Sequence, residues 1–209
     1  MPSADLLIPF FIASLMFAFF PGPALLYTAA QTLARGRRAG LAAALGIHTG
    51  GYVHVLGATL GLSAMLAHVP TAYLALKLFG AAYLVWLGLK MLAPQKRAEP
   101  PTVQAKTARR AFVESVAVEV LNPKAALFFI AFLPQFVDPA AAWPVWLQLL
   151  TLGTIVNALF TGADIVTVFL TERVVRVVRS SGAGARIARA VGGSALIGLG
   201  AHLALSRAQ

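Results

Sequence analysis

The chain has 209 residues, of which 59% are hydrophobic and 11% charged, with a formal net charge of +10. Its mean hydropathy is +0.79. Soluble domains carry about a quarter of their residues as charged side chains, so this composition excludes a water-soluble globule and indicates a membrane protein. Nucleic-acid binding is not expected, because the basic residues stand in short clusters between long apolar runs and do not cover one folded face.

Six apolar runs are long enough to cross a membrane, since a helix needs about 20 residues to span roughly 30 Å of hydrocarbon. They lie near residues 5–33, 40–67, 70–92, 111–136, 144–171 and 188–206. No Lys or Arg precedes the first run, so it lacks the positive segment of a cleavable signal peptide and should remain in the mature protein. The pattern predicts an all-α membrane protein with six transmembrane helices.

The first and fourth runs are each interrupted by a capping residue followed by proline. Gly22-Pro23 stands in the first run and Asn122-Pro123 in the fourth. Gly and Asn are good N-caps, and proline is favoured at the first helical position. We therefore predict that helices 1 and 4 are broken inside the membrane and that a new half-helix starts at each proline. Prolines in membrane helices also make kinks that serve packing alone, and this alternative stays open.

Each break should expose backbone groups to the protein interior. The prolines remove donors and should free the carbonyls of Phe17, Phe19 and Glu119. The N–H groups of the new half-helices, at the positive end of the helix dipole, would suit a substrate carboxylate. The substrate-binding candidates at the two breaks are Pro21, Gly22, Pro23, Asn122, Pro123 and Lys124.

The matched breaks divide the chain into two halves of three predicted spans. Because three is odd, the halves must insert with opposite orientation, as in inverted-repeat transporters. We predict a 3+3 inverted-topology repeat in one membrane domain, with a first repeat at 1–93, a basic cytoplasmic loop at 94–110 and a second repeat at 111–209. Among the loops, only the first, third and fifth are basic, and basic loops face the cytoplasm. Both termini should therefore lie outside.

Ionisable groups deep in the predicted spans indicate function, because a charge near the membrane centre costs about 2.5–3.5 kcal/mol on insertion scales. Glu119 and Lys124 lie inside the fourth run and would neutralise one another as a pair, while Glu114 lies nearer its cytoplasmic end. Asp164 lies inside the fifth run. Glu119 and Asp164 are candidates for proton coupling. His54 in the second run is a third, since histidine changes charge near neutral pH, although a packed hydrogen-bonding role also fits it.

Two further stripes follow from helical periodicity. The polar residues of the fifth run share one face within about 100° and are Thr154, Asn157, Thr161, Asp164 and Thr171. Asn157 and Thr161 are candidates for substrate binding, with interhelical hydrogen bonding as the alternative. The glycines of the second run share a face that should let another helix approach closely, and they are Gly46, Gly50, Gly57 and Gly61.

Several motifs stand in a characteristic order along the chain. They are Pro21-Gly22-Pro23, Gly46 with Gly50, Gly61-Leu62, Gly80-Ala81-Ala82-Tyr83-Leu84 with Leu87-Gly88, Asn122-Pro123-Lys124, Phe128-Phe129, Leu133-Pro134-Gln135-Phe136 and the segment 192–200. In these motifs the whole chain resembles the LysE/RhtB (lysine exporter / homoserine-threonine exporter) family of bacterial inner-membrane efflux proteins. The resemblance implies efflux of amino acids or close derivatives, driven by the proton motive force. Some members carry an acidic residue early in the second span, where this chain has Gly50-Gly51, so neutral substrates such as threonine or homoserine are favoured over cationic ones.

The expected function is therefore a secondary exporter, and the expected partners are a small amino-acid substrate, protons and membrane lipid, with a homo-oligomer left open. No cofactor, metal or nucleic acid is expected. Export of a metal ion or of another small solute is the alternative, but four scattered His and no Cys argue against a metal. A membrane-embedded enzyme would need a nucleophile–base or metal-ligand pair on one helix. The sequence shows none, so no catalytic residue is assigned.

Overall fold

The computed structural model describes residues 4–64 and 108–179 as two continuous segments, together with scattered residues between 75 and 93 and between 186 and 205. In these residues the secondary structure is helical and includes no strand. The predicted all-α class is confirmed for this part of the chain.

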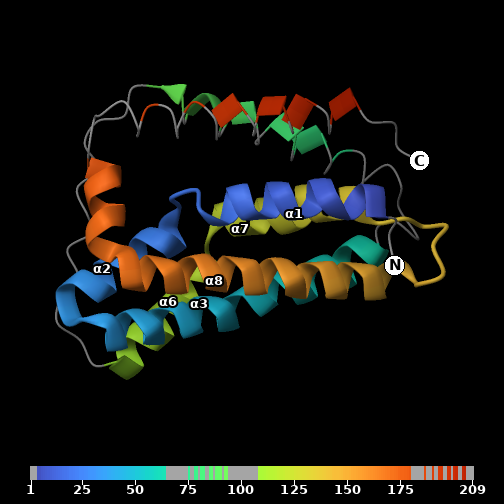
Figure 1. Cartoon of the computed structure of the whole chain (residues 1–209). Helices are drawn as coiled ribbons and strands as arrows, with labels where there is room; N and C mark the ends of the chain where they lie inside the picture. Colours follow the sequence, from blue (N-terminus) through green and yellow to red (C-terminus); the bar gives the residue numbers. More distant parts are fainter. Residues whose placement is uncertain are drawn as a thin grey trace.

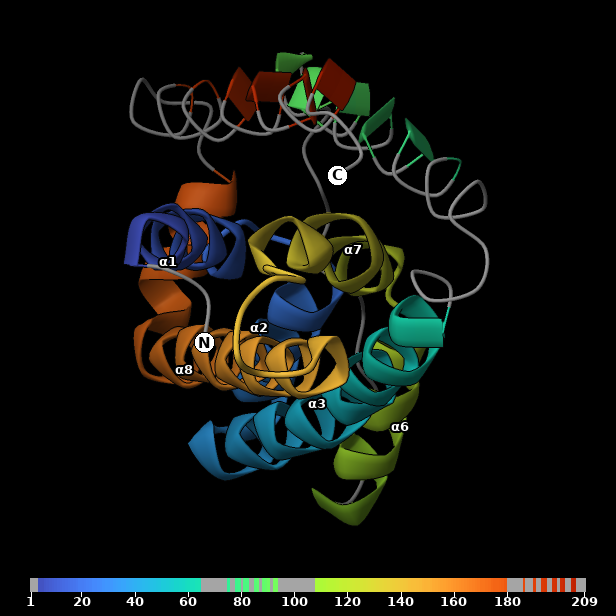
Figure 2. The same cartoon turned by 90° about the vertical axis from the view of Figure 1, so that its right-hand side faces the viewer.

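The helices of each described segment follow one another along the chain. In chain order they are α1 (Ala4–Ala18), α2 (Pro23–Arg35), α3 (Arg37–Gly57), the π-helical turn η1 (Ala58–Leu62), α6 (Ala108–Val120), α7 (Pro123–Leu127), the π-helical turn η2 (Phe128–Phe132), the 3-10 turn η3 (Leu133–Phe136) and α8 (Val145–Arg179). Helix α8 runs along the length of the molecule, with α1 on one side and α3 on the other (Figure 1). The end view in Figure 2 shows the same order. Helix α3 packs most extensively against α6 and next against α8.

The two predicted helix breaks are confirmed. Residues Leu7–Ala18 and Pro23–Arg35 form a pair bent by 46°, and Arg109–Val120 and Pro123–Phe136 form a pair bent by 42°. Gly22 is the N-cap of α2 in an extended conformation, with Pro23 in the first turn. Asn122 is the N-cap of α7, and its side chain accepts a hydrogen bond of 3.1 Å from the backbone N–H of Lys124. The capping chemistry that predicted the breaks therefore acts at both of them.

The number of membrane spans is confirmed only in part. Within the described residues, Val145–Thr171 of α8 is long and apolar enough to cross a membrane, and the count rises to three if each bent pair is one span. These three correspond to the predicted fifth, first and fourth spans. Helix α3 does not reach the same apolarity, and the predicted third and sixth spans and the loop at 94–107 lie largely outside the described residues. The six-span repeat stays a prediction.

The helices extend beyond two of the predicted spans. The first basic loop shrinks to Gly36, whose φ of 79° lies in the left-handed region that suits glycine and turns the chain directly from α2 into α3. The span in α8 ends at Thr171, as predicted, but the helix itself continues eight residues further to Arg179, after a departure from helical geometry at Leu170 (φ −108°, ψ 18°).

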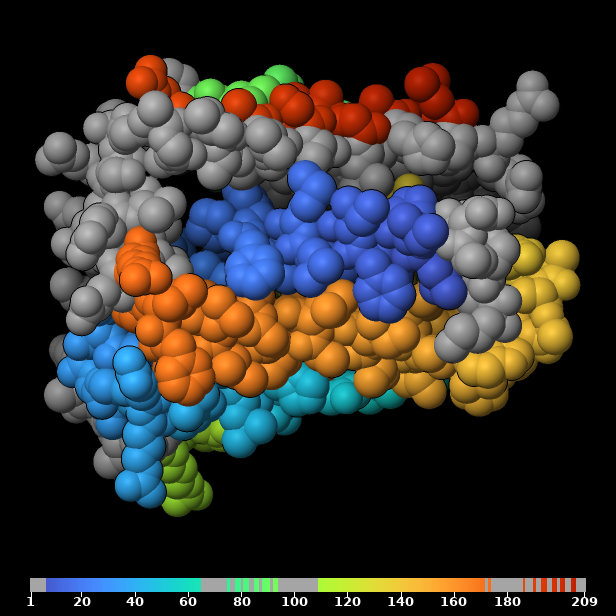
Figure 3. Space-filling view, viewed as in Figure 1, coloured from blue at the N-terminus to red at the C-terminus, as the bar shows by residue number. Residues whose placement is uncertain are grey.

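An aromatic core joins α1 to the turns that follow α7. The rings of Phe17 and Phe128 lie 4.5 Å apart, and those of Phe128 and Phe132 lie 4.3 Å apart. Large apolar side chains on the outer face of α1 are exposed, among them Ile8 and Ile12. Figure 3 shows α1 lying along α8 on this face of the molecule. Such an exposed apolar helix face is expected where the solvent is lipid.

Candidate functional site

The two helix breaks meet around a small cavity of about 30 Å³. Its polar lining comes from Glu119 and Asn122 at the break between α6 and α7, Lys124 at the start of α7, and Asp164 on α8. The rest of the lining is small or apolar and comprises Ala18, Gly22, Ala24, Leu25, Ile47, Ala125 and Phe160. This volume suits water and not a whole solute. The structure therefore brings five of the predicted site residues together in a closed conformation.

Lys124 reaches across to the other break. Its Nζ donates hydrogen bonds to the carbonyl of Phe17 (2.8 Å) and to that of Phe20 (2.7 Å). The Phe17 carbonyl is one of those that the prolines were predicted to free. The side chain of Lys124 makes no hydrogen bond to Glu119, with which we predicted mutual neutralisation, although the two charges lie within electrostatic reach. Lys124 instead donates to backbone oxygens, because the end of α1 lies beside the start of α7 in the fold. The sequence of α7 alone does not show this contact.

Glu119 is buried with 3% of its surface exposed, and its Oε2 accepts a hydrogen bond of 2.9 Å from Nδ2 of Asn122. The carbonyl of Glu119, which Pro123 was predicted to free, accepts a hydrogen bond of 2.7 Å from Nε2 of His54. His54 therefore contacts the backbone of the break and not the carboxylate. Its ring also stacks at 5.9 Å on Phe129.

Asp164 is also 3% exposed. It lies within electrostatic reach of Glu119 and Lys124, and the Thr28 side chain of α2 lies beside it without completing a hydrogen bond. Two carboxyl groups and one amine thus share the space between the breaks. A solute that carries both a positive and a negative group can find a partner for each in such a site.

Asn157 and Thr161 lie outside the cavity lining and face α3. The amide Nδ2 of Asn157 donates to the carbonyl of His48 at 3.0 Å, and Nδ1 of His48 lies 2.7 Å from the Thr161 hydroxyl. A Cβ added at Gly51 would overlap the side-chain oxygen of Asn157. These contacts have the form of the interhelical hydrogen bonding that was the alternative role for both residues.

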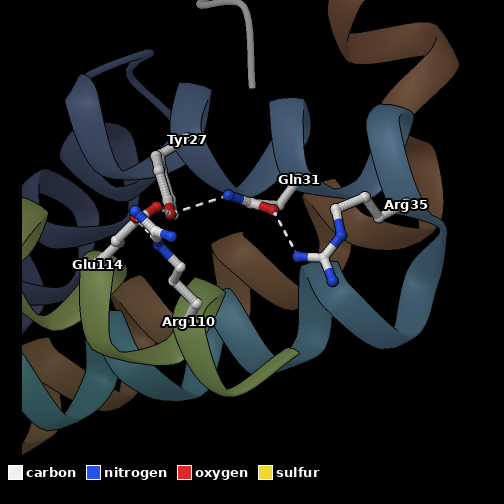
Figure 4. Close-up of polar contacts among 5 residues, drawn as sticks. All are labelled: Tyr27, Gln31, Arg35, Arg110 and Glu114. Carbon is white, nitrogen blue, oxygen red and sulfur yellow. Dashed lines mark hydrogen bonds and ion pairs between the residues drawn. The ribbon is translucent and has the colours of Figure 1, made fainter. Parts of the chain in front are cut away.

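Further polar contacts between the half-helices were not predicted. The Tyr27 hydroxyl donates to Oε2 of Glu114 at 3.1 Å, and Nε2 of Gln31 donates to the Tyr27 hydroxyl at 2.8 Å. Arg110 pairs with Oε1 of Glu114 at 3.1 Å. Figure 4 shows this cluster, which also includes Arg35 and joins α2 to α6. The spacing of four residues between Tyr27 and Gln31 was the sequence signal that they share a helix face.

In the part of the chain that the structure describes, no group of three or more His, Cys, Asp or Glu side chains could hold a metal ion. The residues around the cavity can recognise a solute through backbone N–H groups, two carboxyl groups and an apolar wall.

Comparison with known proteins points the same way as the motifs. Residues 15–207 match the family described as LysE type translocator. The chain is 35% identical over 179 residues to an uncharacterized membrane protein of Pseudomonas aeruginosa, covering 79% of this chain and 83% of that one. It is 30% identical over 145 residues to a homoserine/homoserine lactone efflux protein of Salmonella typhimurium, covering 69% of each chain.

A leucine efflux protein of Klebsiella pneumoniae is 29% identical over 137 residues, covering 65% of each chain. No solved structure matches the chain. The predicted resemblance is confirmed by the family match, which spans both helix breaks and the cavity between them, and this membrane protein belongs to the LysE type translocator family.

Proposed function

We propose that this protein is a secondary transporter that exports amino acids or close derivatives, preferably neutral ones, at the expense of the proton motive force. Amino-acid efflux is the activity named for the Salmonella and Klebsiella relatives. The observation that carries the proposal is the cavity between the two helix breaks, where Glu119, Asp164 and the first turn of α2 converge. Transporters place their substrate sites at such breaks near the bilayer midplane.

The site has a place for each charge of a zwitterion. Ala24 and Leu25 line the cavity in the first turn of α2, where backbone N–H groups have no intrahelical acceptor. They would hold the carboxylate of the substrate at the positive end of the helix dipole. Glu119 or Asp164 would meet its ammonium group, and the other would exchange a proton. Pro21, Gly22 and Pro23 shape the turn that presents these groups.

The walls of the cavity support a neutral side chain. The side chains of Ala18, Leu25, Ile47 and Phe160 offer only apolar contact to the rest of a substrate. This chain has Gly50-Gly51 where the resemblance implies an acidic residue in some family members, and at Gly51 the space that a side chain would need is filled by Asn157. A cationic side chain would thus find no additional carboxylate on this side of α3.

Transport of this kind requires the closed cavity to open alternately to the two sides. We propose that two halves at 1–93 and 111–209, joined by the loop at 94–110, form a six-span 3+3 inverted repeat and rock against each other around the site. The matched bends of 46° and 42° support this symmetry.

The membrane is proposed to be the bacterial inner membrane, with the basic loops in the cytoplasm and both termini outside. A cysteine introduced at Arg37 should be protected from an impermeant thiol reagent in intact cells, while one at Asp138 should be labelled. Arg37 is the first residue of α3, and Asp138 lies in the connection between η3 and α8. The reverse labelling pattern would overturn the orientation, and a cysteine-free chain needs no prior substitution.

Purified protein in liposomes tests the proposed activity. The liposomes are loaded in turn with labelled leucine, threonine, homoserine, lysine or a divalent metal, with and without an imposed pH gradient. We expect efflux of neutral amino acids that is faster with the gradient and collapses when an uncoupler is added. Efflux of the metal alone would favour the alternative of metal export, and hydrolysis or modification of a solute without its transfer would favour an enzyme.

Substitutions of Pro23 and Pro123 test the proposed binding site for the substrate carboxylate. Pro123→Ala restores an N–H that can bond to the Glu119 carbonyl, where it would compete with the His54 ring. Pro23→Ala adds a donor to the start of α2. We expect either change to straighten its break and to lower transport roughly tenfold, while the protein still inserts. Full activity in both variants, measured in the same liposome assay, would leave the prolines as packing kinks.

A further inference from the structure

The amine of Lys124 sits in a cage built by the opposite helix break. Two backbone carbonyls accept its hydrogen bonds, those of Phe17 and Phe20 at the C-terminal end of α1. Three aromatic faces surround it, with Nζ 4.5 Å from the Phe17 ring centroid, 5.2 Å from that of Phe20 and 5.9 Å from that of Phe160. Carbonyl oxygens and aromatic faces both present negative potential. The cage is a cation site.

The charge balance around the cage also favours a cation. Glu119 on α6 and Asp164 on α8 lie within electrostatic reach of Lys124 and bring negative charge to the same space. Without Lys124, the buried carboxyl groups of Glu119 and Asp164 would lose a nearby positive charge. The carbonyls of Phe17 and Phe20 would lose its hydrogen bonds, and among the described residues only that of Phe17 has another donor, the backbone N–H of Phe20 at 3.2 Å. These carboxyl and carbonyl groups therefore need a cation in the cage to compensate for their burial.

Gly22 leaves space for the side chain of Lys124. A Cβ added at Gly22 would lie 2.7 Å from Cδ of Lys124, so the lysine stem passes over the one residue of the break that has no side chain. The lysine and its two acceptors are 104 and 107 residues apart in the sequence, so the contact joins the two halves of the chain. Gly22 at one break thus accommodates the side chain of Lys124 from the other break.

In many secondary carriers, the carbonyls of an unwound segment and the C-terminal end of a half-helix coordinate the coupling ion, commonly Na⁺. We propose that Lys124 is a built-in cation that permanently fills this ion site at the end of α1, so that transport neither binds nor requires Na⁺. The statement about transport rests on the proposed function, whereas the assignment of the cation site does not. A tethered ammonium cannot be carried across the membrane, which leaves the proton as the ion that the neighbouring carboxyl groups can exchange.

The first test uses the unaltered protein. Amino-acid efflux from liposomes under a fixed pH gradient is measured with either Na⁺ or choline as the main salt cation on both sides. We expect equal rates in the two media. Efflux that requires Na⁺ would overturn the proposal while leaving amino-acid export intact. An absence of any amino-acid efflux would instead overturn the proposed function, and the cation site would then be judged by the second test.

The second test measures cation binding at the site and does not depend on transport. Lys124→Ala should lower the thermal midpoint of the detergent-solubilised protein and should create a site for a free ammonium. We expect methylammonium chloride to raise the midpoint of this variant by about 2–4 °C more than choline chloride does at the same concentration. The wild type should show no such difference, because its cage is filled.

The matched control is Arg37→Ala, which removes a cation that lies 5.3 Å from the Phe169 ring centroid on the surface and donates to no freed carbonyl of a break. It should respond equally to both salts. If Lys124→Ala does not fold, Lys124→Ser replaces it, since the short side chain also leaves the cage empty and without charge. Equal responses of wild type and of the folded lysine variant to methylammonium and choline would overturn the proposal.

Discussion

Replacing the two buried carboxyl groups by amides, Glu119→Gln and Asp164→Asn, is expected to abolish proton-driven efflux in at least one variant. An amide keeps the shape and polarity of the carboxyl group but cannot exchange a proton. Moving one charge through a potential of 100 mV is worth about 2.3 kcal/mol, which corresponds to roughly a 50-fold concentration ratio. A variant that has lost its proton carrier should therefore be unable to build a gradient of this order.

Substrate exchange separates coupling from binding. Exchange of labelled for unlabelled amino acid across the membrane need not move a proton, so it should be partly retained in the variant that has lost gradient-driven efflux. Glu119 accepts a hydrogen bond from Asn122, and the oxygen of a glutamine can still accept it. Loss of both exchange and efflux would indicate that the carboxyl group binds substrate or supports the fold instead.

Glu114→Gln is the matched control. Glu114 lies one to two turns before Glu119 on α6 with a side chain 30% exposed, and it contacts Tyr27 and Arg110 outside the cavity. We expect a smaller effect on efflux there, because an exposed carboxylate is readily hydrated and the amide oxygen can still accept from Tyr27. Wild-type efflux and pH response in both cavity variants would exclude both groups as proton carriers, and His54 would become the next candidate.

Local chemistry made the helix breaks predictable from the sequence. Capping and the loss of a proline donor act within about four residues, so Gly22-Pro23 and Asn122-Pro123 were sufficient to place the starts of α2 and α7. The bare apolar run of α8 was predictable for the same reason, since length and hydropathy need no knowledge of neighbours. The predicted span end at Thr171 agrees with the structure, and the helix continues beyond it because a helix does not have to end where its apolar span ends.

Partners across the fold were not predictable. The polar stripe of α8 is wide enough to meet two neighbours, so Asp164 faces the cavity while Asn157 and Thr161 bond to α3. Periodicity groups such residues but does not say which helix each one meets. Phe160 and Ile47 carried no signal at all, because an apolar residue in an apolar run is the most ordinary feature of a membrane helix.

The glycine stripe of the second run divides in the structure into two kinds of position. A Cβ added at Gly46 would overlap the Phe112 carbonyl and the Ser115 hydroxyl of α6, and one added at Gly50 would lie 2.8 Å from the Val116 carbonyl. At Gly57, by contrast, no described atom lies within 4 Å. The predicted close approach of another helix is confirmed at the first two positions, and at Gly57 and Gly61 it stays a prediction, since no described atom lies within 4 Å there.

Gly46→Ala is expected to destabilise the protein by about 1–3 kcal/mol, because the obstacle is backbone of α6 and the most extensive helix contact must open to admit a methyl group. Gly57→Ala, the control on the same helix, should be neutral or slightly stabilising, since alanine restricts the unfolded chain at no steric cost. Thermal midpoints of the detergent-solubilised variants, measured side by side, decide the comparison. Equal midpoints would show that α3 and α6 separate easily, in which case the position of Glu119 beside the cavity would not depend on this contact.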